Sequence, residues 1–362
     1  MIKSVYIHIP FCKTICSYCD FCKLHYHSKW VNEYLNSLEK EIKENYKNEV
    51  IDTIYIGGGT PTCLTLNELE RLFCILKGIR TSNNIEYTIE GNIESIDESK
   101  LKLFRSVGIN RLSIGIETFN EGYLSFLNRN HNVNQAREKI ALMKKVGFNN
   151  INIDLIYALP NQTLEEVKKD LNEFLKLDIP HISTYSLIIE EHTKLYIESV
   201  KNIDEDLDLL MYEKINKTLT NNGYHQYEIS NYSKKGFESK HNLTYWNNDE
   251  YYGFGLGASG YINNMRYTNT RSLSNYINGK YILEKDILTE EEIIENAFIL
   301  GFRKIKGINI DSFNRKYNTD ILKNNIIEEL IKNNKLINDG QNVYINPKKL
   351  YVSNDILVNF VN

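Results

Sequence analysis

Predicted strands and helices alternate through the first two thirds of the chain, and this alternation most constrains the fold. Six short runs rich in β-branched and other apolar residues are predicted to be strands: residues 5–9, 53–56, 86–90, 111–116, 150–156 and 181–187. Amphipathic stretches between them are predicted to be helices: residues 29–47, 65–77, 97–107, 134–146 and 163–177. Because apolar strands separated by helices form a parallel sheet covered on both faces, the pattern predicts an α/β fold, either a doubly wound sheet or an incomplete barrel. In both architectures functional residues gather at the carboxyl ends of the strands.

Three cysteines follow the first predicted strand with the spacing C-x3-C-x2-C: Cys12, Cys16 and Cys19. Thiols this close in sequence converge on one point only if the chain wraps around that point, and thiolates are the usual ligands of iron–sulfur clusters and of zinc. Three ligands are one fewer than a closed Cys₄ site has, so a cluster held in this way keeps one iron open for chemistry. The alternative is one face of a helix carrying three buried cysteines, but Pro10 and the flanking aromatic residues disfavour a helix here.

Glycines and acidic residues follow the later strands. Residues 57–61 read Gly-Gly-Gly-Thr-Pro after the second strand. Glycines allow a close backbone approach to a ligand, but this segment has neither G-x-G-x-x-G nor a Walker lysine, and a tight turn is the alternative. Glu90 ends the third strand, where it either faces a site or forms a surface ion pair. Asp154 lies inside an otherwise apolar strand, which favours a site role over a structural cap because a buried carboxylate is costly unless it is satisfied.

The cysteine segment resembles the signature of radical S-adenosylmethionine (SAM) proteins, in the branch related to the oxygen-independent coproporphyrinogen III oxidases. The similarity lies in Tyr6-Ile-His-Ile-Pro-Phe-Cys12 and in Cys16-Ser-Tyr-Cys19-Asp-Phe21. It implies that the three cysteines hold a [4Fe–4S] cluster and that the amino and carboxylate groups of SAM chelate the fourth iron. An electron from the cluster would then cleave SAM to a 5′-deoxyadenosyl radical. The resemblance also selects the partial (β/α)₆ barrel among the two architectures.

The same resemblance assigns residues to SAM. Residues 57–61 match the family's GGGTP motif, which contacts the methionine amino group of SAM. The family usually has Gln where Glu117 stands and Gly where Ala158 stands; Glu can still accept a hydrogen bond from a ribose hydroxyl but cannot donate one. Tyr6 and Phe21 flank the cluster motif. The cofactor-binding residues expected from these matches are Tyr6, Phe21, Gly57, Gly58, Gly59, Thr60, Glu90, Glu117, Arg137 and Asp154.

Two arginines after the fourth strand are candidates for the SAM carboxylate. Arg129 lies in a segment that matches the family's L-x-R-x-H motif, and Arg137 lies on the helix that follows. A guanidinium suits a carboxylate because it can donate two parallel hydrogen bonds. Either arginine could instead be a solvated helix charge, and we favour Arg137 for the ligand role.

A second distinctive segment begins at His241 and reads His-Asn-Leu-Thr-Tyr-Trp, with further aromatic residues and glycines up to residue 260. Histidine is the commonest transition-metal ligand among side chains, and a flat porphyrin would suit these surroundings. From the residues alone, a structural histidine with satisfied hydrogen bonds is the favoured reading. The segment matches the H-N-x-x-Y-W motif of haem chaperones of the HemW type, which implies that haem uses His241.

The character of the sequence changes near residue 288. An amphipathic helix is predicted at residues 290–302, followed by helices at 311–316 and 321–332 and a hairpin-like end at 336–345, which resembles the small winged-helix-like α+β domain of the same family. We expect a lid or docking role, because no basic cluster that would read DNA is evident. The expected domains are a radical SAM core barrel at 1–235 with its cluster loop at 10–24, a connecting segment with the HNxxYW motif at 236–285, and the C-terminal domain at 286–362.

Composition excludes several classes of function. A net charge of −4 over 362 residues provides no electrostatic reason to expect nucleic acid. No apolar run approaches the ~20 residues that span a bilayer, and the N-terminus lacks the pattern of a signal peptide. Six cysteines, three of them in one loop, do not resemble a disulfide framework. We therefore expect a protein of the reducing cytoplasm that is not itself transmembrane.

Two features separate the chain from the oxidases. Only eleven residues precede Cys12, whereas oxidases carry an N-terminal extension, and Phe21 stands where oxidases typically have a further cysteine. The leading hypothesis is a haem chaperone that binds a [4Fe–4S] cluster, SAM and haem, receives electrons from a reductant such as a flavodoxin or ferredoxin, and passes haem to a membrane-bound or cytosolic haemoprotein. The alternative is an enzyme of the coproporphyrinogen III oxidase type that acts on a tetrapyrrole in porphyrin biosynthesis. A third reading is a zinc-binding or cluster-binding structural protein whose SAM motifs have decayed.

Overall fold

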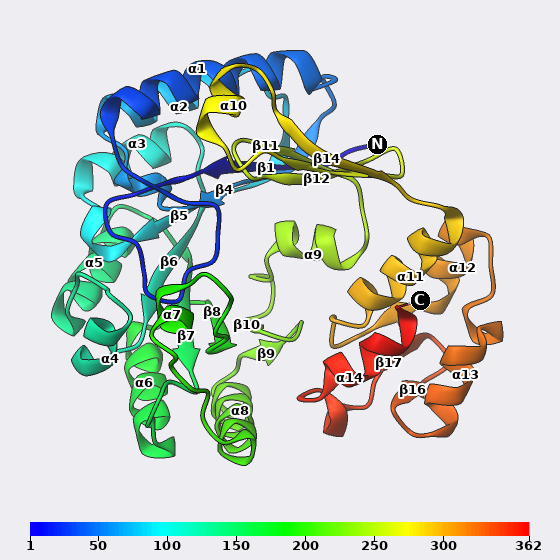
Figure 1. Ribbon diagram of the computed structural model, residues 1–362. Coiled ribbons are helices and arrows are strands. Elements are labelled where there is room, and N and C mark those ends of the chain that lie inside the picture. The colour runs from blue at the N-terminus through cyan, green and yellow to red at the C-terminus, as the bar shows by residue number, and fades with distance from the viewer. Residues whose placement is uncertain (362) are drawn as a thin grey trace.

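The main sheet is an open, curved sheet whose central strands follow the order of the chain (Figure 1). The computed structural model describes residues 1–361; Asn362, the last residue of the expected C-terminal domain, lies outside them. The predicted strands are six neighbouring parallel strands: β1 (Ser4–Ile9), β4 (Ile51–Gly58), β5 (Thr81–Asn92), β6 (Arg111–Glu117), β7 (Asn150–Tyr157) and β8 (His181–Ser186). A doubly wound sheet would reverse its strand order at a switch point. The uninterrupted order therefore confirms the partial barrel, which does not close.

Helices cover the outer face of this curved sheet (Figure 1). The five predicted helices are confirmed as α1 (Ser28–Asn45), α2 (Leu66–Leu76), α3 (Glu98–Ser106), α5 (Val133–Lys145) and α6 (Leu164–Leu177). Three of them begin at capping boxes, formed by Thr65 with Glu68, Asn132 with Gln135, and Thr163 with Glu166. The remaining helices of this part are α4 (Glu121–Phe126), α7 (Lys194–Ile197) and α8 (Glu205–Asn221).

The two faces of the barrel strands differ because successive side chains of a strand point to opposite sides. In β5 the apolar Ile89 packs in the core beneath the helices, whereas Glu86, Thr88 and Glu90 alternate with it on the other face. The same alternation recurs in the neighbouring strands, and the core members are Ile7, Ile54, Leu112, Ile114, Ile153 and Ile182. The concave face is consequently lined by polar and aromatic side chains.

Both edges of the sheet are extended by segments without a strong strand signal. At one edge β11 (Tyr251–Phe254) pairs in parallel with β1, and β12 (Ser259–Ile262), β13 (Met265–Asn269) and β14 (Ile282–Ile287) follow as antiparallel strands. The segment 236–285, which the sequence pattern presents as a connection, therefore supplies strands to the main sheet, together with helices α9 (Lys240–Trp246) and α10 (Leu273–Ile277). At the other edge lie β10 (Asn231–Ser233) and β9 (His225–Gln226).

The C-terminal residues form a winged-helix-like unit with its own core, as predicted. Its helices are α11 (Glu290–Gly301), α12 (Ile310–Tyr317), α13 (Asn325–Lys332) and α14 (Ser353–Leu357). A small antiparallel sheet combines β15 (Ile308–Asn309), β17 (Asn342–Ile345) and β16 (Leu336–Asn338). Its core combines isoleucine, leucine and valine side chains with a cluster of phenylalanines in contact, Phe298, Phe302, Phe313 and Phe360.

Short elements complete the fold. The two-residue strands β2 (Phe11–Cys12) and β3 (Leu24–His25) pair with each other, and 3₁₀ turns lie at Pro61–Cys63, Ile93–Ser95, Ile321–Lys323, Pro347–Lys349 and Val358–Phe360. None of the helices described here is long and apolar enough to cross a membrane.

Candidate functional site

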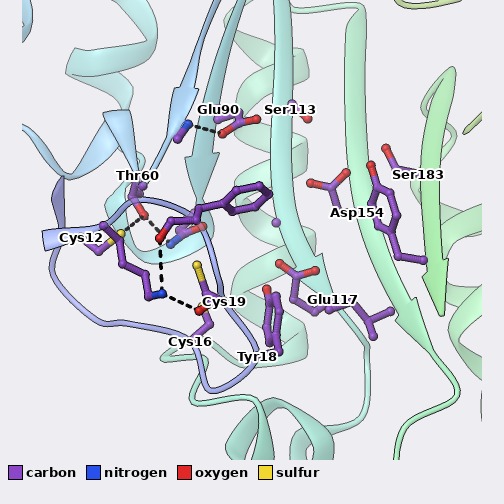
Figure 2. A pocket seen from close by; sticks show the side chains of 18 of the residues that line it. Cys12, Cys16, Tyr18, Cys19, Thr60, Glu90, Ser113, Glu117, Asp154 and Ser183 are labelled. Atoms are coloured by element: carbon purple, nitrogen blue, oxygen red, sulfur yellow. Dashed lines mark hydrogen bonds between the residues drawn. The ribbon is translucent and has the colours of Figure 1, made fainter. Parts of the chain in front are cut away.

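A cavity of about 370 Å³ opens on the concave face, at the carboxyl ends of the barrel strands. This volume lies within the usual range of small-molecule sites. Figure 2 shows its two sides: the cysteine loop between β2 and β3 lies on one, and carboxylates from β5, β6 and β7 lie on the other. The position agrees with the expectation for barrels, where strand ends and the loops after them build the site.

Cys12, Cys16 and Cys19 all line this cavity. Cys12 ends β2, and Cys16 and Cys19 lie in the loop after it; none of the three is helical, so the alternative of three cysteines on one helix face does not hold. Cys12 is buried while the other two are partly exposed. Burial raises the pKa of the Cys12 thiol to about 11, and burial also raises the pKa of Cys19. A positively charged cluster core would be needed to keep these thiols ionised near neutral pH.

The turn after α4 holds the cysteine loop in place. The Ser17 amide donates to the Leu127 carbonyl at 3.1 Å, and the Asn128 side chain donates to the Ile15 carbonyl at 2.8 Å. Asn130 donates through its amide nitrogen to the Thr14 hydroxyl at 2.6 Å. The loop that carries the thiols is therefore tied to the segment that carries Arg129.

The donor set fits an iron–sulfur cluster better than a single metal ion. Within the described part of the chain, no three His, Cys, Asp or Glu side chains are close enough together to hold one ion. The three thiols nevertheless face one cavity, as a ligand wider than one ion requires. Cys22 does not belong to this set, because it packs against Gly257 and interacts with Arg271.

The glycine turn after β4 brings the backbone against the cysteine loop. Gly58 has φ +112°, and a Cβ there would lie 2.6 Å from the His8 ring. A Cβ at Gly59 would lie 3.0 Å from the Cys12 sulfur. Thr60 completes the turn, with its hydroxyl 3.5 Å from the same sulfur. Gly58, Gly59 and Thr60 line the cavity, whereas Gly57 packs against the Glu90 carboxylate.

Three carboxylates face the cavity from adjacent strands, as Figure 2 shows; Glu117 is buried, and Glu90 and Asp154 are partly buried. Glu90 accepts hydrogen bonds from the Tyr55 hydroxyl at 2.6 Å and from the Gly58 amide at 3.0 Å, and burial raises its pKa to about 7. Asp154 accepts from the Asn152 side chain at 2.9 Å, and burial raises its pKa as well. Glu117 lies at a register shift at the end of β6 with φ +72°, and burial raises its pKa to about 7.

Arg129 occupies the cavity, and Arg137 does not. The Arg129 guanidinium lies 3.7 Å from the Glu117 carboxylate and 3.3 Å from the Cys16 sulfur. Burial alone would lower its pKa, but the Glu117 carboxylate raises the pKa of Arg129 above its usual value. Arg137 lies partly exposed on α5, where it pairs with Glu173 of α6 at 2.5 Å. The position of Arg137 in its predicted helix could not reveal this partner, because Glu173 belongs to a different helix.

Several residues of the cavity wall were not singled out from the sequence. Tyr55, Arg111, Ser113, Asn152 and Ser183 line the cavity from the concave face of the strands. The period-2 alternation of polar and apolar residues was the available signal, because it marks which side chains share the concave face.

Three large apolar side chains lie exposed in the lining of the cavity, beside the exposed carboxylates of Asp20 and Glu190, and we call these three the apolar mouth. Phe21 from the cysteine loop is 63% exposed, Tyr185 at the end of β8 is 43% exposed and Ile188 just after it is 66% exposed. All three line the cavity. Large exposed apolar side chains gathered at a cavity mark a binding surface more often than isolated ones do.

Tyr6 and His241 lie beneath the cavity and do not line it. The Tyr6 hydroxyl bonds to His8 Nδ1 at 3.0 Å. His241 is 1% exposed, and its two ring nitrogens are bonded to the Thr53 and Tyr245 hydroxyls, each at 2.8 Å. A haem iron needs a free ring nitrogen, so His241 as it stands here does not fit the role of a haem ligand.

Comparison with known proteins places this chain in a family. The model of the radical SAM superfamily matches residues 6–174. The heme chaperone HemW of Lactococcus lactis is 39% identical, with 99% of this chain and 97% of that protein aligned, and HemW of Bacillus subtilis is 37% identical with 99% of each aligned. Coproporphyrinogen III oxidase (HemN) from Escherichia coli, a solved structure, superposes with a TM-score of 0.87 over 99% of this chain and 90% of that one; at 21% identity this likeness shows a shared fold.

Proposed function

Because this chain belongs to the HemW family within the radical SAM superfamily, we propose that it is a haem chaperone that binds a [4Fe–4S] cluster, SAM and haem and transfers the haem to an acceptor haemoprotein. The HemW proteins of Lactococcus lactis and Bacillus subtilis align over nearly their whole length. The observation that carries the proposal is that three cysteines of one non-helical segment, three carboxylates and the apolar mouth meet in one cavity. The expected place of action is the cytoplasm, with a flavodoxin or ferredoxin as reductant.

Cys12, Cys16 and Cys19 would hold the cluster. Their loop is fixed at its ends by the pairing of β2 with β3 and in its middle by the turn at residues 127–130. When bound, the cluster supplies an electron to SAM at an iron that has no protein ligand. The chain itself supplies a rigid loop and an enclosed position for the thiols.

The polar wall opposite the cysteines would bind SAM. Carboxylate oxygens of Glu90 and Asp154 each have lone pairs left after their internal hydrogen bonds, so they can accept from amino and hydroxyl groups. Arg129 Nε is buried without a hydrogen-bond partner among the described residues. A buried orphan donor is costly, and the carboxylate of a ligand would satisfy it. We therefore replace Arg137 by Arg129 as the proposed arginine for SAM.

The apolar mouth would take the face of the haem. Phe21, Tyr185 and Ile188 present large apolar surfaces at the opening, and Lys23 in the same lining offers a cation for a haem carboxylate. The sequence-based assignment of haem to His241 finds no support in the hydrogen bonding of that residue. The proposal therefore places haem at the mouth and leaves the iron ligand unassigned.

The test is an anaerobic haem titration followed by transfer. The reconstituted full chain is titrated with haem and followed by absorbance; it is then mixed with a haem-free b-type haemoprotein whose regained spectrum reports transfer. We expect saturation near one haem per chain and weaker binding by Ile188→Lys, because a cation in the apolar mouth must be desolvated. Leu210→Lys, which changes an exposed leucine outside the cavity lining, is the matched control.

The same preparation tests the enzymatic alternative. Supplied with SAM, a reductant and coproporphyrinogen III, a chaperone forms no protoporphyrinogen IX. Turnover of this substrate, together with haem binding that does not saturate, would replace the chaperone proposal by an activity of the coproporphyrinogen III oxidase type.

A further inference from the structure

A line of contacts runs from the HNxxYW segment on α9 to the wall of the cavity. The His241 ring stacks on the Tyr55 ring, with 5.1 Å between ring centroids and 27° between their planes. The hydroxyl of Tyr55 donates to Glu90 Oε1 at 2.6 Å, and the second oxygen of Glu90 accepts from the Gly58 amide at 3.0 Å. Tyr55 therefore joins a residue beneath the cavity to a carboxylate that faces into it.

The hydrogen bonds of Thr53 indicate which tautomer the His241 ring adopts. The Thr53 hydroxyl donates to Ser4, so the hydrogen between Thr53 and His241 belongs to Nδ1 of the histidine. Nε2 is then the acceptor, and it receives the Tyr245 hydroxyl at 2.8 Å. This nitrogen carries the lone pair that an iron would need, and it is already used.

The backbone at the start of α9 is held by hydrogen bonds, as the His241 ring is. Glu86 on β5 accepts from the amides of His241 and Lys240 at 3.0 Å each, and it lies on the same face of the strand as Glu90, four residues later. One strand thus holds both the start of α9 and the carboxylate that the stacked Tyr55 contacts.

The far end of α9 is held by the C-terminal domain. The Arg303 guanidinium lies over the Trp246 ring at 5.6 Å, and Lys304 donates to the Asn247 side chain at 2.6 Å. Lys316 donates to the Asn247 carbonyl at 3.0 Å. Figure 1 shows α9 between the main sheet and the helices of this domain. The helix is therefore held from both sides.

We propose that His241 is a positioning residue, which through the stacked Tyr55 fixes the Glu90 carboxylate in the cofactor cavity, and that it is not the haem-iron ligand. The proposal rests on the proposed function in one respect, since SAM is taken as the ligand that Glu90 meets. Without the stacked imidazole the Tyr55 ring can tilt and lose its hydrogen bond to Glu90. The Gly58 amide is then the remaining donor to this carboxylate. A carboxylate held by one contact pays more ordering entropy when a ligand binds.

The experiment measures two affinities in the same anaerobically reconstituted full chain: SAM by equilibrium dialysis, with the cluster's electron paramagnetic resonance signal as a spectroscopic check, and haem by absorbance. The variants are Tyr55→Phe, His241→Ala, His241→Phe, which keeps a ring over Tyr55, and the double variant Tyr55→Phe/His241→Ala. Tyr224→Phe is the matched control, because it removes a buried tyrosine hydroxyl bonded to the Ile179 carbonyl, outside the cavity lining.

We expect Tyr55→Phe and His241→Ala each to weaken SAM binding about tenfold and to change the SAM-dependent resonance signal, since each removes the fixed contact to a charged acceptor. The Kd of the double variant for SAM should be at most about twice the Kd of whichever single variant binds SAM less tightly, because both substitutions act through one contact. His241→Phe should restore SAM affinity to within about threefold of wild type. The haem spectrum should be the same in all of them.

Two results would overturn the proposal. The first is a SAM affinity of His241→Ala within twofold of wild type. The second is loss or shift of the haem Soret band in both His241→Ala and His241→Phe while Tyr55→Phe keeps it, which would make His241 the iron ligand. Failure of the chaperone proposal is distinguished from failure of this one by the SAM and haem binding of the wild-type protein alone. Wild type that binds SAM but no haem sinks the chaperone proposal and leaves this one standing, whereas wild type that binds no SAM removes both.

Discussion

The pair of Glu117 and Arg129 makes a specific prediction about stability, because both side chains are almost fully buried, with 7% and 3% of their surface exposed. Their charged groups lie 3.7 Å apart. At an effective dielectric constant of about 20, Coulomb's law gives an attraction of about 4 kcal/mol at this distance. Removing one member of a buried pair typically costs about 3–5 kcal/mol, because the other charge is left without a partner.

The perturbation is Arg129→Gln, compared with Glu117→Gln and with the double variant. At pH 8 Glu117 is largely ionised, since burial raises its pKa to about 7. We expect Arg129→Gln to lower the free energy of unfolding by about 3–5 kcal/mol and Glu117→Gln to lower it by about 1–3 kcal/mol. The double variant should lose about 3 kcal/mol less than the sum of the two single losses, which is the coupling expected of a buried pair in contact.

The assay is urea unfolding of the reduced, cluster-free chain at pH 8, followed by circular dichroism. Arg137→Gln is the matched control: it makes the same substitution at a partly exposed arginine, whose pair with Glu173 should contribute no more than about 1 kcal/mol. Additive losses in the double variant, or equal losses for Arg129→Gln and Arg137→Gln, would refute the view that Arg129 is held by Glu117 inside the cavity.

Three further predictions concern other parts of the molecule. Cys16→Ser should abolish the iron–sulfur absorbance after anaerobic reconstitution while Cys22→Ser keeps it, because only the former lines the cavity; iron content and absorbance measure this, and equal loss in both would contradict the cysteine assignment. Burial raises the pKa of Glu41 from 4.5 to about 7 despite stabilising hydrogen bonds, so its contribution to stability is complete below pH 4.5 and is lost as the pH rises towards 7, a change of about 3 kcal/mol. Unfolding curves across this range should show a smaller pH slope for Glu41→Gln than for wild type, and identical slopes would refute the assignment. Ala158 has φ +59° and is buried, so Ala158→Gly should stay within about 1 kcal/mol of wild type while Ala158→Val loses about 2 kcal/mol or more; thermal unfolding compares the two, and a valine variant as stable as the glycine variant would show that this backbone is not held in the left-handed region.

The roles of Arg129 and Arg137 could not be separated from the sequence. Both arginines follow the fourth barrel strand, and both could meet a carboxylate. The structure pairs Arg137 with Glu173 of the neighbouring helix and encloses Arg129 with Glu117 and Cys16. These partners are 12 to 113 residues away along the chain. Patterns of residues close together in the sequence do not reveal partners this far apart along the chain. Only the packing of helices and loops could therefore decide between the two arginines.

His241 shows the same limit in a different form. A histidine beside aromatic residues suits either a haem ligand or a satisfied structural residue, and the residue types are the same in both cases. The decision depends on Thr53 and Tyr245, one of which comes from a strand far earlier in the chain. The strands at residues 251–287 were also missed, because short aromatic and glycine-containing segments lack a clear alternation. Only β11 pairs with the edge of β1, and β12, β13 and β14 each pair with the strand before them.

The sequence by itself determined the alternation of strands and helices, the approximate extents of the main helices, the helices and hairpin of the C-terminal segment, and the cysteine spacing, whereas the barrel and the winged-helix-like form were implied by the family resemblance. The features determined by the sequence follow from contacts between residues near in sequence: strand alternation, helical period, capping boxes and the reach of a short loop. Only the tertiary structure decided which charged and aromatic side chains share the cavity and which lie beneath it. Burial, ion pairing and stacking join strands and helices that are far apart in the chain, so their partners exist only after the sheet has curved and the helices have packed.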